Sequence, residues 1–281
     1  MFLRAASKTY IVAEIGINHE GSLDKAMRMI RLAAEAGADA VKFQKRTPRM
    51  VVPPSEWDAI RDTPWGPMTK VAYRERVEFG GLEYEELIRY ANENGVELFA
   101  SAWDCNAADT LYCLDMPVFK IPSAKLTDLA LVEHIAKFHL PVIASTGMST
   151  KKDIDAAMKL LYPNCPEIAL LVCTAEYPAQ VSNLHLNRIR EMQWAYPDVT
   201  IGYSGHELET GPSIAAVALG AQVIERHVTL DRNMKGSDQS SSLTFPEFAR
   251  MVGMIRDVEA AMGQAHIGPR ACEAKAFARL R

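Results

Sequence analysis

The sequence predicts a single (β/α)8 barrel, and three observations support this fold class. Eight apolar runs of four to seven residues recur along the chain, each of a length typical of a strand. Each run is followed by a segment whose apolar residues recur at helical spacing. No linker or composition break divides the 281 residues, and their 48% apolar content can fill one large core. A doubly wound open sheet is the alternative fold, and length alone also permits two ordinary domains.

The expected elements follow one another in a regular order. The strand at residues 10–16 leads to Ser22, which can cap a helix over residues 23–38 that stops near Gly37. The further strands are expected at residues 40–44, 97–101, 118–122, 141–145, 168–174, 200–203 and 223–227. The further helices are expected at about residues 82–95, 106–114, 126–139, 150–162, 184–196, 209–220 and 244–262. This alternation is typical of a parallel sheet with crossover helices.

Residues 45–80 interrupt the alternation after the second strand. The segment is rich in proline, tryptophan and charged residues, and segments of this length are usually either functional or disordered. It follows the C-terminal end of a strand, which is where barrel enzymes place their active sites. We expect one barrel domain over residues 1–263 and a C-terminal tail over residues 264–281, which is either a linker or a closing helix.

Charge and composition narrow the class of protein. The formal net charge is −4 and the charged residues are interspersed, so the basic stripe of a nucleic-acid-binding protein is missing. No apolar run reaches about 18 residues and the N-terminus lacks the apolar core of a signal peptide, so we expect a cytoplasmic protein that binds no membrane. The five cysteines lack CxxC spacing, which predicts reduced, mostly buried thiols.

Two histidines stand at the ends of strands that we expect to be neighbours. His206 follows the run at residues 200–203, and His227 ends the run at residues 223–227. Neighbouring parallel strands lie about 4.8 Å apart, so the two side chains could bind one small metal ion between them. The alternative is that each is an ordinary histidine at the end of a strand.

The C-terminal ends of the expected strands are unusually polar. Lys42 and Lys120 lie within apolar runs, and a buried lysine needs an anionic partner. That partner is either a neighbouring carboxylate, such as Glu14 or Glu225, or a bound phosphate or carboxylate group. The other polar residues at these ends are Gln44, Ser101, Asp104, Ser123, Ser145, Thr146, Thr174, Tyr177, Ser204, His206 and His227. Spacing alone does not rank the carboxylates Glu14, Asp104, Glu225 and Asp238 by role.

Seven short motifs occur in order along the chain. They are AEIGINH at residues 13–19, VKFQ at 41–44, KIPS at 120–123, STGM at 145–148, CTAEYP at 173–178, GYSGH at 202–206 and ERHVTLD at 225–231. Together they resemble the sialic acid synthase (N-acetylneuraminate synthase) family over about residues 10–263. We expect a short form that lacks the family's small C-terminal antifreeze-like domain.

The resemblance implies a (β/α)8 enzyme that condenses phosphoenolpyruvate with the open-chain aldehyde of N-acetylmannosamine or a related aldose, giving a nonulosonic acid and phosphate. A divalent cofactor, manganese or magnesium with cobalt as a further candidate, is implied at His206 and His227. The implied substrate-binding residues are Lys42, Gln44, Ser101, Lys120, Ser123, Ser145 and Ser204. The implied catalytic residues are Glu14, Tyr177, Glu225 and Asp238. A homodimer is the expected assembly.

Departures from the family pattern leave the sugar open. Gly205 stands where the family often has aspartate, residues 101–104 read SAWD instead of TPFD, and residues 236–239 read GSDQ instead of GPDH. In the family, the antifreeze-like domain lends an arginine to the partner's sugar site. We therefore expect the arginine-rich and tryptophan-rich segment 45–80 to select the sugar, unless it only packs on the barrel rim or at a dimer contact.

Two other functions stay open. A related 3-deoxy-octulosonate or 3-deoxy-heptulosonate type of synthase would share the barrel and phosphoenolpyruvate and would differ in the aldose. A non-catalytic binding barrel is the alternative from another class of protein. The presence of Glu14, Lys42, Lys120, His206 and His227 argues against a silent barrel.

Overall fold

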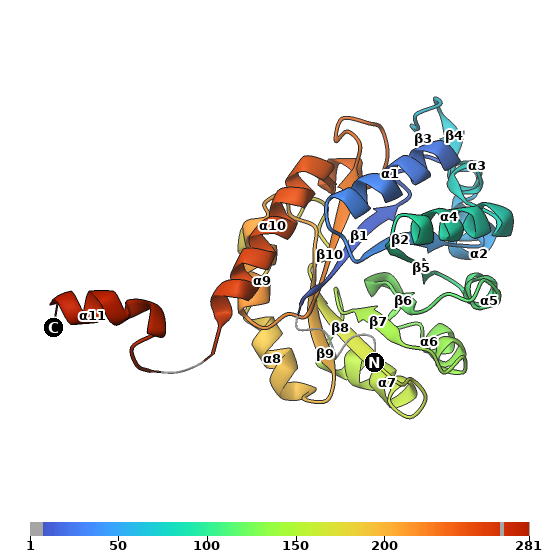
Figure 1. The fold of residues 1–281 in the computed structure, drawn as a ribbon. Helices are drawn as coiled ribbons and strands as arrows, with labels where there is room; N and C mark the ends of the chain where they lie inside the picture. Colours follow the sequence, from blue (N-terminus) through green and yellow to red (C-terminus); the bar gives the residue numbers. More distant parts are fainter. Residues whose placement is uncertain (1–7, 265–266, 281) are drawn as a thin grey trace.

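A computed structural model describes residues 8–264 and 267–280, and its centre is a closed barrel of eight parallel strands (Figure 1). The strands are β1 (Tyr10–Gly16), β2 (Ala40–Lys45), β5 (Glu97–Ala102), β6 (Phe119–Ile121), β7 (Val142–Ser145), β8 (Ile168–Cys173), β9 (Thr200–Gly205) and β10 (Val223–Thr229). They lie side by side in that order, and β10 pairs with β1 to close the ring. A short strand, β11 (Leu243–Thr244), extends from β10. The predicted (β/α)8 fold is confirmed, and the open sheet is wrong.

Helices form the outer layer of the barrel (Figure 1). They are α1 (Leu23–Glu35), α4 (Gly81–Glu93), α5 (Cys105–Cys113), α6 (Leu129–Ala136), α7 (Lys151–Leu161), α8 (Arg188–Ala195), α9 (Gly211–Ala218) and α10 (Phe245–Met262). Polar caps start several of them, as when the Ser22 hydroxyl accepts a hydrogen bond from the Lys25 N–H. The helices predicted at residues 126–139 and 184–196 are too long, because the buried Leu126 and Leu184 directly follow 3-10 turns and precede the first turns of α6 and α8.

The barrel strands are covered on both sides, which explains their nearly continuous apolar sequences. Every residue of β7, β8, β9 and β10 is buried. Side chains alternate between the barrel interior and the helical layer along each strand. A charged residue on the inner face therefore has to find its partners inside the barrel.

Residues 45–80 are folded rather than disordered. The segment contains α2 (Pro48–Val51), the 3-10 turn η1 (Pro54–Glu56), a hairpin of β3 (Ile60–Arg61) with β4 (Met68–Thr69), and α3 (Lys70–Val77). Lys45 and Glu78 pair at 2.9 Å and hold the two ends of the segment together. The Trp57 indole N–H donates to the Val52 carbonyl at 2.9 Å. These contacts hold the segment on the barrel without a long regular element, which is why apolar spacing does not predict its fold.

The chain after α10 forms η5 (Ala271–Glu273) and α11 (Ala274–Leu280), which lie away from the barrel in Figure 1. All of residues 267–280 are exposed, so α11 does not close the barrel. None of the described helices is both long enough and apolar enough to cross a membrane. The five cysteines are free thiols, but only Cys165 and Cys173 are buried, so the prediction of mostly buried thiols is wrong.

A buried ion pair joins β10 to the residues that follow β9. The Arg226 guanidinium lies 3.0 Å from Glu207 Oε1, and the Tyr203 hydroxyl donates to Glu207 Oε2 at 2.8 Å. Arg226 also donates to the Ser213 hydroxyl at 2.7 Å. A Cβ atom at Gly205 would lie 2.7 Å from the Glu207 carboxylate, so the glycine leaves room for it. The family often has an aspartate at position 205, and this chain instead has an acidic residue, Glu207, two positions later.

Replacing Glu207 with alanine should lower the free energy of unfolding by about 3–5 kcal/mol, because Arg226 would remain buried without its partner. The measurement is urea unfolding of Glu207→Ala and the parent. Glu209→Ala is the matched control, since the Glu209 side chain is exposed. A loss of less than about 1 kcal/mol in Glu207→Ala would show that the pair contributes little.

A second prediction concerns His19, which is buried and stacks on Phe79 with ring centroids 4.2 Å apart. Burial lowers the pKa of His19 to about 3. As the pH falls below about 6.5, His19 therefore becomes protonated in the unfolded chain but stays neutral in the folded chain. Stability is complete above pH 6.5 and declines by up to about 1.4 kcal/mol per pH unit as the pH falls from there towards 3. Chemical unfolding of His19→Phe should show a shallower decline than the parent. Parallel curves for the two proteins between pH 6.5 and 4 would contradict this origin.

Candidate functional site

A cavity of about 420 Å³ lies at the C-terminal ends of the barrel strands. Each of the eight strands contributes at least one side chain to its wall. All thirteen predicted site residues line this cavity: Glu14, Lys42, Gln44, Ser101, Lys120, Ser123, Ser145, Tyr177, Ser204, His206, Glu225, His227 and Asp238. Their roles remain predictions, and their position agrees with that of active sites in barrel enzymes.

The register of neighbouring strands brings these side chains together. Glu14 stands opposite Lys42 on β2 and opposite His227 on β10. Ser101 stands opposite Lys120 on β6. Because every second residue of a strand faces the interior, polar residues spaced by two on one strand reach the same cavity. Distant parts of the sequence therefore meet through strand pairing alone.

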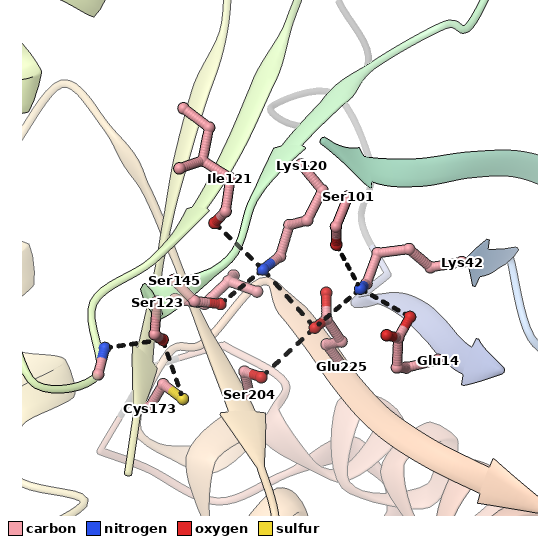
Figure 2. Close-up of polar contacts among 12 residues, drawn as sticks. Glu14, Lys42, Ser101, Lys120, Ile121, Ser123, Ser145, Cys173, Ser204 and Glu225 are labelled. Atoms are coloured by element: carbon pink, nitrogen blue, oxygen red, sulfur yellow. Dashed lines mark hydrogen bonds and ion pairs between the residues drawn. The ribbon is translucent and has the colours of Figure 1, made fainter. Parts of the chain in front are cut away.

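Two lysines and two carboxylates form a buried charge network in the cavity wall (Figure 2). Lys42 Nζ lies 2.6 Å from Glu14 Oε2 and donates to the Ser101 hydroxyl at 2.9 Å. Glu225 Oε1 lies between the lysines, 3.6 Å from Lys42 Nζ and 3.7 Å from Lys120 Nζ. All four charged side chains are buried. The neighbouring carboxylates considered as partners for the lysines are therefore present.

Burial and the neighbouring charges set the protonation of this network. Burial acts to lower the pKa of Lys42, but Glu14 and Glu225 outweigh it and raise that pKa. Lys120 has only the more distant Glu225, and burial lowers its pKa. Burial raises the pKa of Glu14. At Glu225, Lys120 and Lys42 outweigh the burial and lower the pKa, so Glu225 is the more firmly ionised carboxylate.

Serine hydroxyl groups surround the lysines (Figure 2). The Ser145 hydroxyl accepts a hydrogen bond from Lys120 Nζ at 2.7 Å. The Ser123 hydroxyl accepts one from the Gly147 N–H at 3.0 Å, and the Ser204 hydroxyl lies 3.5 Å from Glu225 Oε1. Ammonium and hydroxyl donors gathered in this way suit a compact anion such as phosphate or carboxylate.

His206 and His227 come from the paired strands β9 and β10, and their ring centroids lie 5.6 Å apart. His206 Nδ1 lies 2.8 Å from the Thr174 carbonyl and donates to it, which leaves Nε2 for another ligand. Burial acts to lower the pKa of His206, but the contacts with Cys173 and Thr174 raise it. Burial lowers the pKa of His227 to about 4, and His227 Nδ1 has no hydrogen-bond partner.

These residues fit a divalent metal ion. The orphaned nitrogen of His227 is buried, and neutral imidazole is a good ligand for such ions. Asp238 is close enough that His227 outweighs its burial and lowers its pKa. Among residues 8–264 and 267–280, no group of three or more His, Cys, Asp or Glu side chains forms a ready metal site. The protein would therefore supply two nitrogen ligands and leave the remaining positions to oxygen ligands.

One part of the cavity wall is not predicted by the strand-end pattern. Arg46 and Arg74 reach it from the segment 45–80, and Trp103 and Ser237 reach it from loops. Cys173, at the end of β8, lies 3.9 Å from His206 Nδ1. The richness of the segment in arginine and the change to SAWD at residues 101–104 are the sequence signals for this wall.

Asp104, a strand-end carboxylate, lies outside the cavity lining and serves the fold. Its Oδ1 accepts a hydrogen bond from the Ala107 N–H at 2.9 Å and caps α5. Its Oδ2 accepts one from the Thr47 N–H at 2.6 Å and anchors the start of the segment 45–80. This carboxylate is therefore an N-cap rather than a site residue.

Known proteins resemble this chain over most of its length. N-acetylneuraminate-9-phosphate synthase of Homo sapiens is 41% identical over 259 residues, which cover 90% of this chain and 71% of that protein. N,N'-diacetyllegionaminic acid synthase of Campylobacter jejuni is 36% identical over 261 residues, which cover 91% of this chain and 78% of that protein.

A solved structure and a family profile agree with these relatives. The crystal structure of N-acetylneuraminic acid synthetase from Leptospira borgpetersenii, in complex with citrate, superimposes with a TM-score of 0.86 at 29% identity and covers 97% of this chain and 91% of that one. The profile of the NeuB family matches residues 29–267. The chain belongs to the NeuB family and is, like its named relatives, an enzyme of the synthase type.

Proposed function

We propose that this enzyme condenses phosphoenolpyruvate with an aldose in a metal-dependent reaction that gives a nonulosonic acid and phosphate. One observation carries the proposal: two buried lysines share a cavity with three carboxylates, five serines and two histidines. The names of the relatives, which are synthases of N-acetylneuraminate 9-phosphate and of diacetyllegionaminic acid, support the class of product.

Phosphoenolpyruvate carries a carboxylate and a phosphate, and the lysines suit both groups. Among the described residues, Lys120 Nζ donates to the Ser145 hydroxyl at 2.7 Å and to the Ile121 carbonyl at 3.4 Å, and its carboxylate partner Glu225 lies 3.7 Å away, so its positive charge is available to a ligand. Lys42 has Glu14 and Ser101 as close partners, and an ammonium group offers three donors. Ser123 and Ser204 add hydroxyl groups from the neighbouring walls.

The carboxylates have distinct tasks in this proposal. Carbon–carbon bond formation at the aldehyde leaves positive charge at C2 of phosphoenolpyruvate, and water must add there before phosphate leaves. Glu225 Oε2 is buried and has no hydrogen-bond partner, so it can accept a proton from that water. Both Oε atoms of Glu14 already have partners, Lys42 and Gln44, so Glu14 orients these two side chains.

The histidines would hold the metal ion, which acts when bound as a Lewis acid towards an aldehyde oxygen. Tyr177 stacks over His206 with ring centroids 4.1 Å apart and limits the orientation of the imidazole. Asp238 adds a carboxylate beside His227. These contacts would keep the two ligand nitrogens in place before the substrates bind.

The test is phosphate release from phosphoenolpyruvate with a divalent metal, measured across hexoses, N-acylhexosamines and pentoses. Release that depends on an N-acylhexosamine supports the proposal. Release with a pentose alone favours a 3-deoxy-ulosonic acid synthase. Binding of phosphoenolpyruvate without release by any aldose would favour a non-catalytic barrel.

Removing either histidine should abolish metal binding and activity. His206→Ala and His227→Ala each delete one of two protein ligands, so calorimetric titration with Mn²⁺ should show at least a hundredfold weaker binding, on the order expected for lost metal ligands. His134→Ala, on the outer helix α6, is the control. Binding of Mn²⁺ by either site variant as tightly as by the parent would refute the two-histidine site.

Replacing either lysine by methionine should weaken phosphoenolpyruvate binding. Lys42→Met and Lys120→Met each remove a charge-assisted contact of roughly 1.5–3 kcal/mol, which is about ten- to a hundredfold in the dissociation constant. Calorimetry with the metal-loaded protein is the measurement. Lys137→Met is the control, because Lys137 is exposed at the C-terminal end of α6 and does not line the cavity. Unchanged dissociation constants with lowered thermal stability would assign the lysines to structural ion pairs alone.

A further inference from the structure

A second cavity, of about 490 Å³, adjoins the first. The two cavities share four wall residues, Arg46, Arg74, Trp103 and Ala124. Most of the second wall comes from the segment 45–80, including Arg61 of the β3–β4 hairpin. The segment therefore extends the cavity at the barrel end into a second compartment.

The second cavity is strongly cationic. Its wall carries Arg46, Arg61, Lys70, Arg74 and Lys125 and a single carboxylate, Glu56. Lys70 pairs with Glu56, and Lys125 lies 3.1 Å from Asp128 Oδ2. Within the described part of the chain, none of the three arginines forms an ion pair with a carboxylate. Three positive charges thus face this cavity without a carboxylate of the described residues at ion-pair distance, although Asp238 acts on Arg46 and Arg74 from further away.

Arg46 is the most constrained of these cations. It is only 4% exposed, and its buried Nη1 has no hydrogen-bond partner. Its Nη2 donates to the Gln44 side chain, and its guanidinium lies 4.5 Å from the centre of the Trp103 ring. Burial and the charge of Arg74 lower the pKa of Arg46 to about 10. A buried donor without a partner is destabilising, so this position favours an anionic ligand.

Arg61 and Arg74 are held on the same aromatic ring. Their guanidinium carbons lie 4.1 Å and 5.7 Å from the centre of the Tyr73 ring, and Tyr73 itself is buried. Arg61 Nε is buried and also lacks a hydrogen-bond partner. Guanidinium groups fixed in this way present paired donors that match a phosphate.

Charge compensation differs between the two compartments. The lysines of the first cavity have Glu14 and Glu225 as counterions. Among the described residues, no carboxylate pairs closely with the arginines of the second cavity, and only more distant carboxylates, such as Asp238, act on Arg46 and Arg74, so the site favours an anionic ligand. Arg46 connects the two cavities, because it lines both and donates to Gln44 of the first, whereas Lys120 lines only the first.

We propose that the second cavity binds a phosphate group at the far end of the acceptor sugar, so that the substrate is an aldose phosphate. This inference rests on the proposed condensation. That reaction adds the three carbons of phosphoenolpyruvate to the aldehyde carbon, so a phosphate on C6 of a hexose becomes a phosphate on C9 of the product. The Homo sapiens relative is named as a synthase of a 9-phosphate, which agrees with this position.

The test compares N-acetylmannosamine with its 6-phosphate in the metal-loaded enzyme. We expect kcat/KM to be about a hundredfold higher for the 6-phosphate. Arg61→Met should raise KM for the 6-phosphate by about ten- to a hundredfold, because it removes a charge-assisted contact. The reaction of the unphosphorylated sugar and the KM for phosphoenolpyruvate should change less than about threefold in this variant, since Arg61 lines only the second cavity.

Arg49→Met is the matched control. Arg49 belongs to the same segment, but it is exposed, pairs with Glu75 at 3.3 Å and lines neither cavity. Its KM values should match those of the parent. Equal kcat/KM for the two sugars would overturn the inference while leaving the condensation intact. A raised KM for phosphoenolpyruvate with both sugars would also overturn it, because the arginines would then bind the first substrate.

Calorimetry separates this inference from the proposed reaction. The 6-phosphate is titrated into the metal-loaded protein with phosphoenolpyruvate replaced by buffer, so that no turnover is needed. Binding by the parent that weakens at least tenfold in Arg61→Met supports the anion site even when no product forms. The absence of binding by the parent overturns the inference whatever the reaction proves to be.

Discussion

The barrel depends on the mutual neutralisation of Glu14, Lys42, Lys120 and Glu225 in its interior. Moving one unpaired ion out of water into such a place costs several kcal/mol, and only close partners offset that loss. The four residues lie on β1, β2, β6 and β10, so they meet only when the closed barrel has the observed register. The network that makes the cavity chemically useful is therefore also a constraint on the fold around it.

The fold is largely predictable because its signal is local and repeated. Eight short apolar runs correspond to the eight barrel strands, because a strand that is covered on both faces needs apolar residues at nearly every position. The errors in the predicted elements arise where a residue is buried but does not belong to a helix or strand. Leu126 and Leu184 are buried without being helical, so apolar spacing extends two helices too far. The segment 45–80 folds through tertiary contacts such as Lys45 with Glu78, which no local pattern records.

The site was predictable to the extent that it lies on strands. Parallel strands bring their C-terminal ends to one edge, so polar residues at these ends converge whatever their separation in the sequence. Arg46, Arg74 and Trp103 do not follow this rule, because they lie in the segments between strands, with Arg74 in helix α3. The reason for a glycine at position 205 cannot be read from that position alone, because the Glu207 carboxylate occupies the space that a side chain at 205 would need.

The ion pair of Lys42 with Glu14 and the binding of an anionic substrate are compatible. An ammonium group has three donors, and Glu14 and Ser101 are its two partners closer than 3 Å. Glu14 and Glu225 also raise the pKa of Lys42 and so keep this lysine charged inside the barrel, which favours a phosphate ligand. At Arg46 of the second cavity, burial and the charge of Arg74 outweigh the more distant carboxylates and lower the pKa. A ligand with its own negative charge would relieve that repulsion. The two cavities therefore differ in charge: the lysines of the first have carboxylate partners in the protein, whereas the arginines of the second favour an acceptor sugar that carries a negative charge.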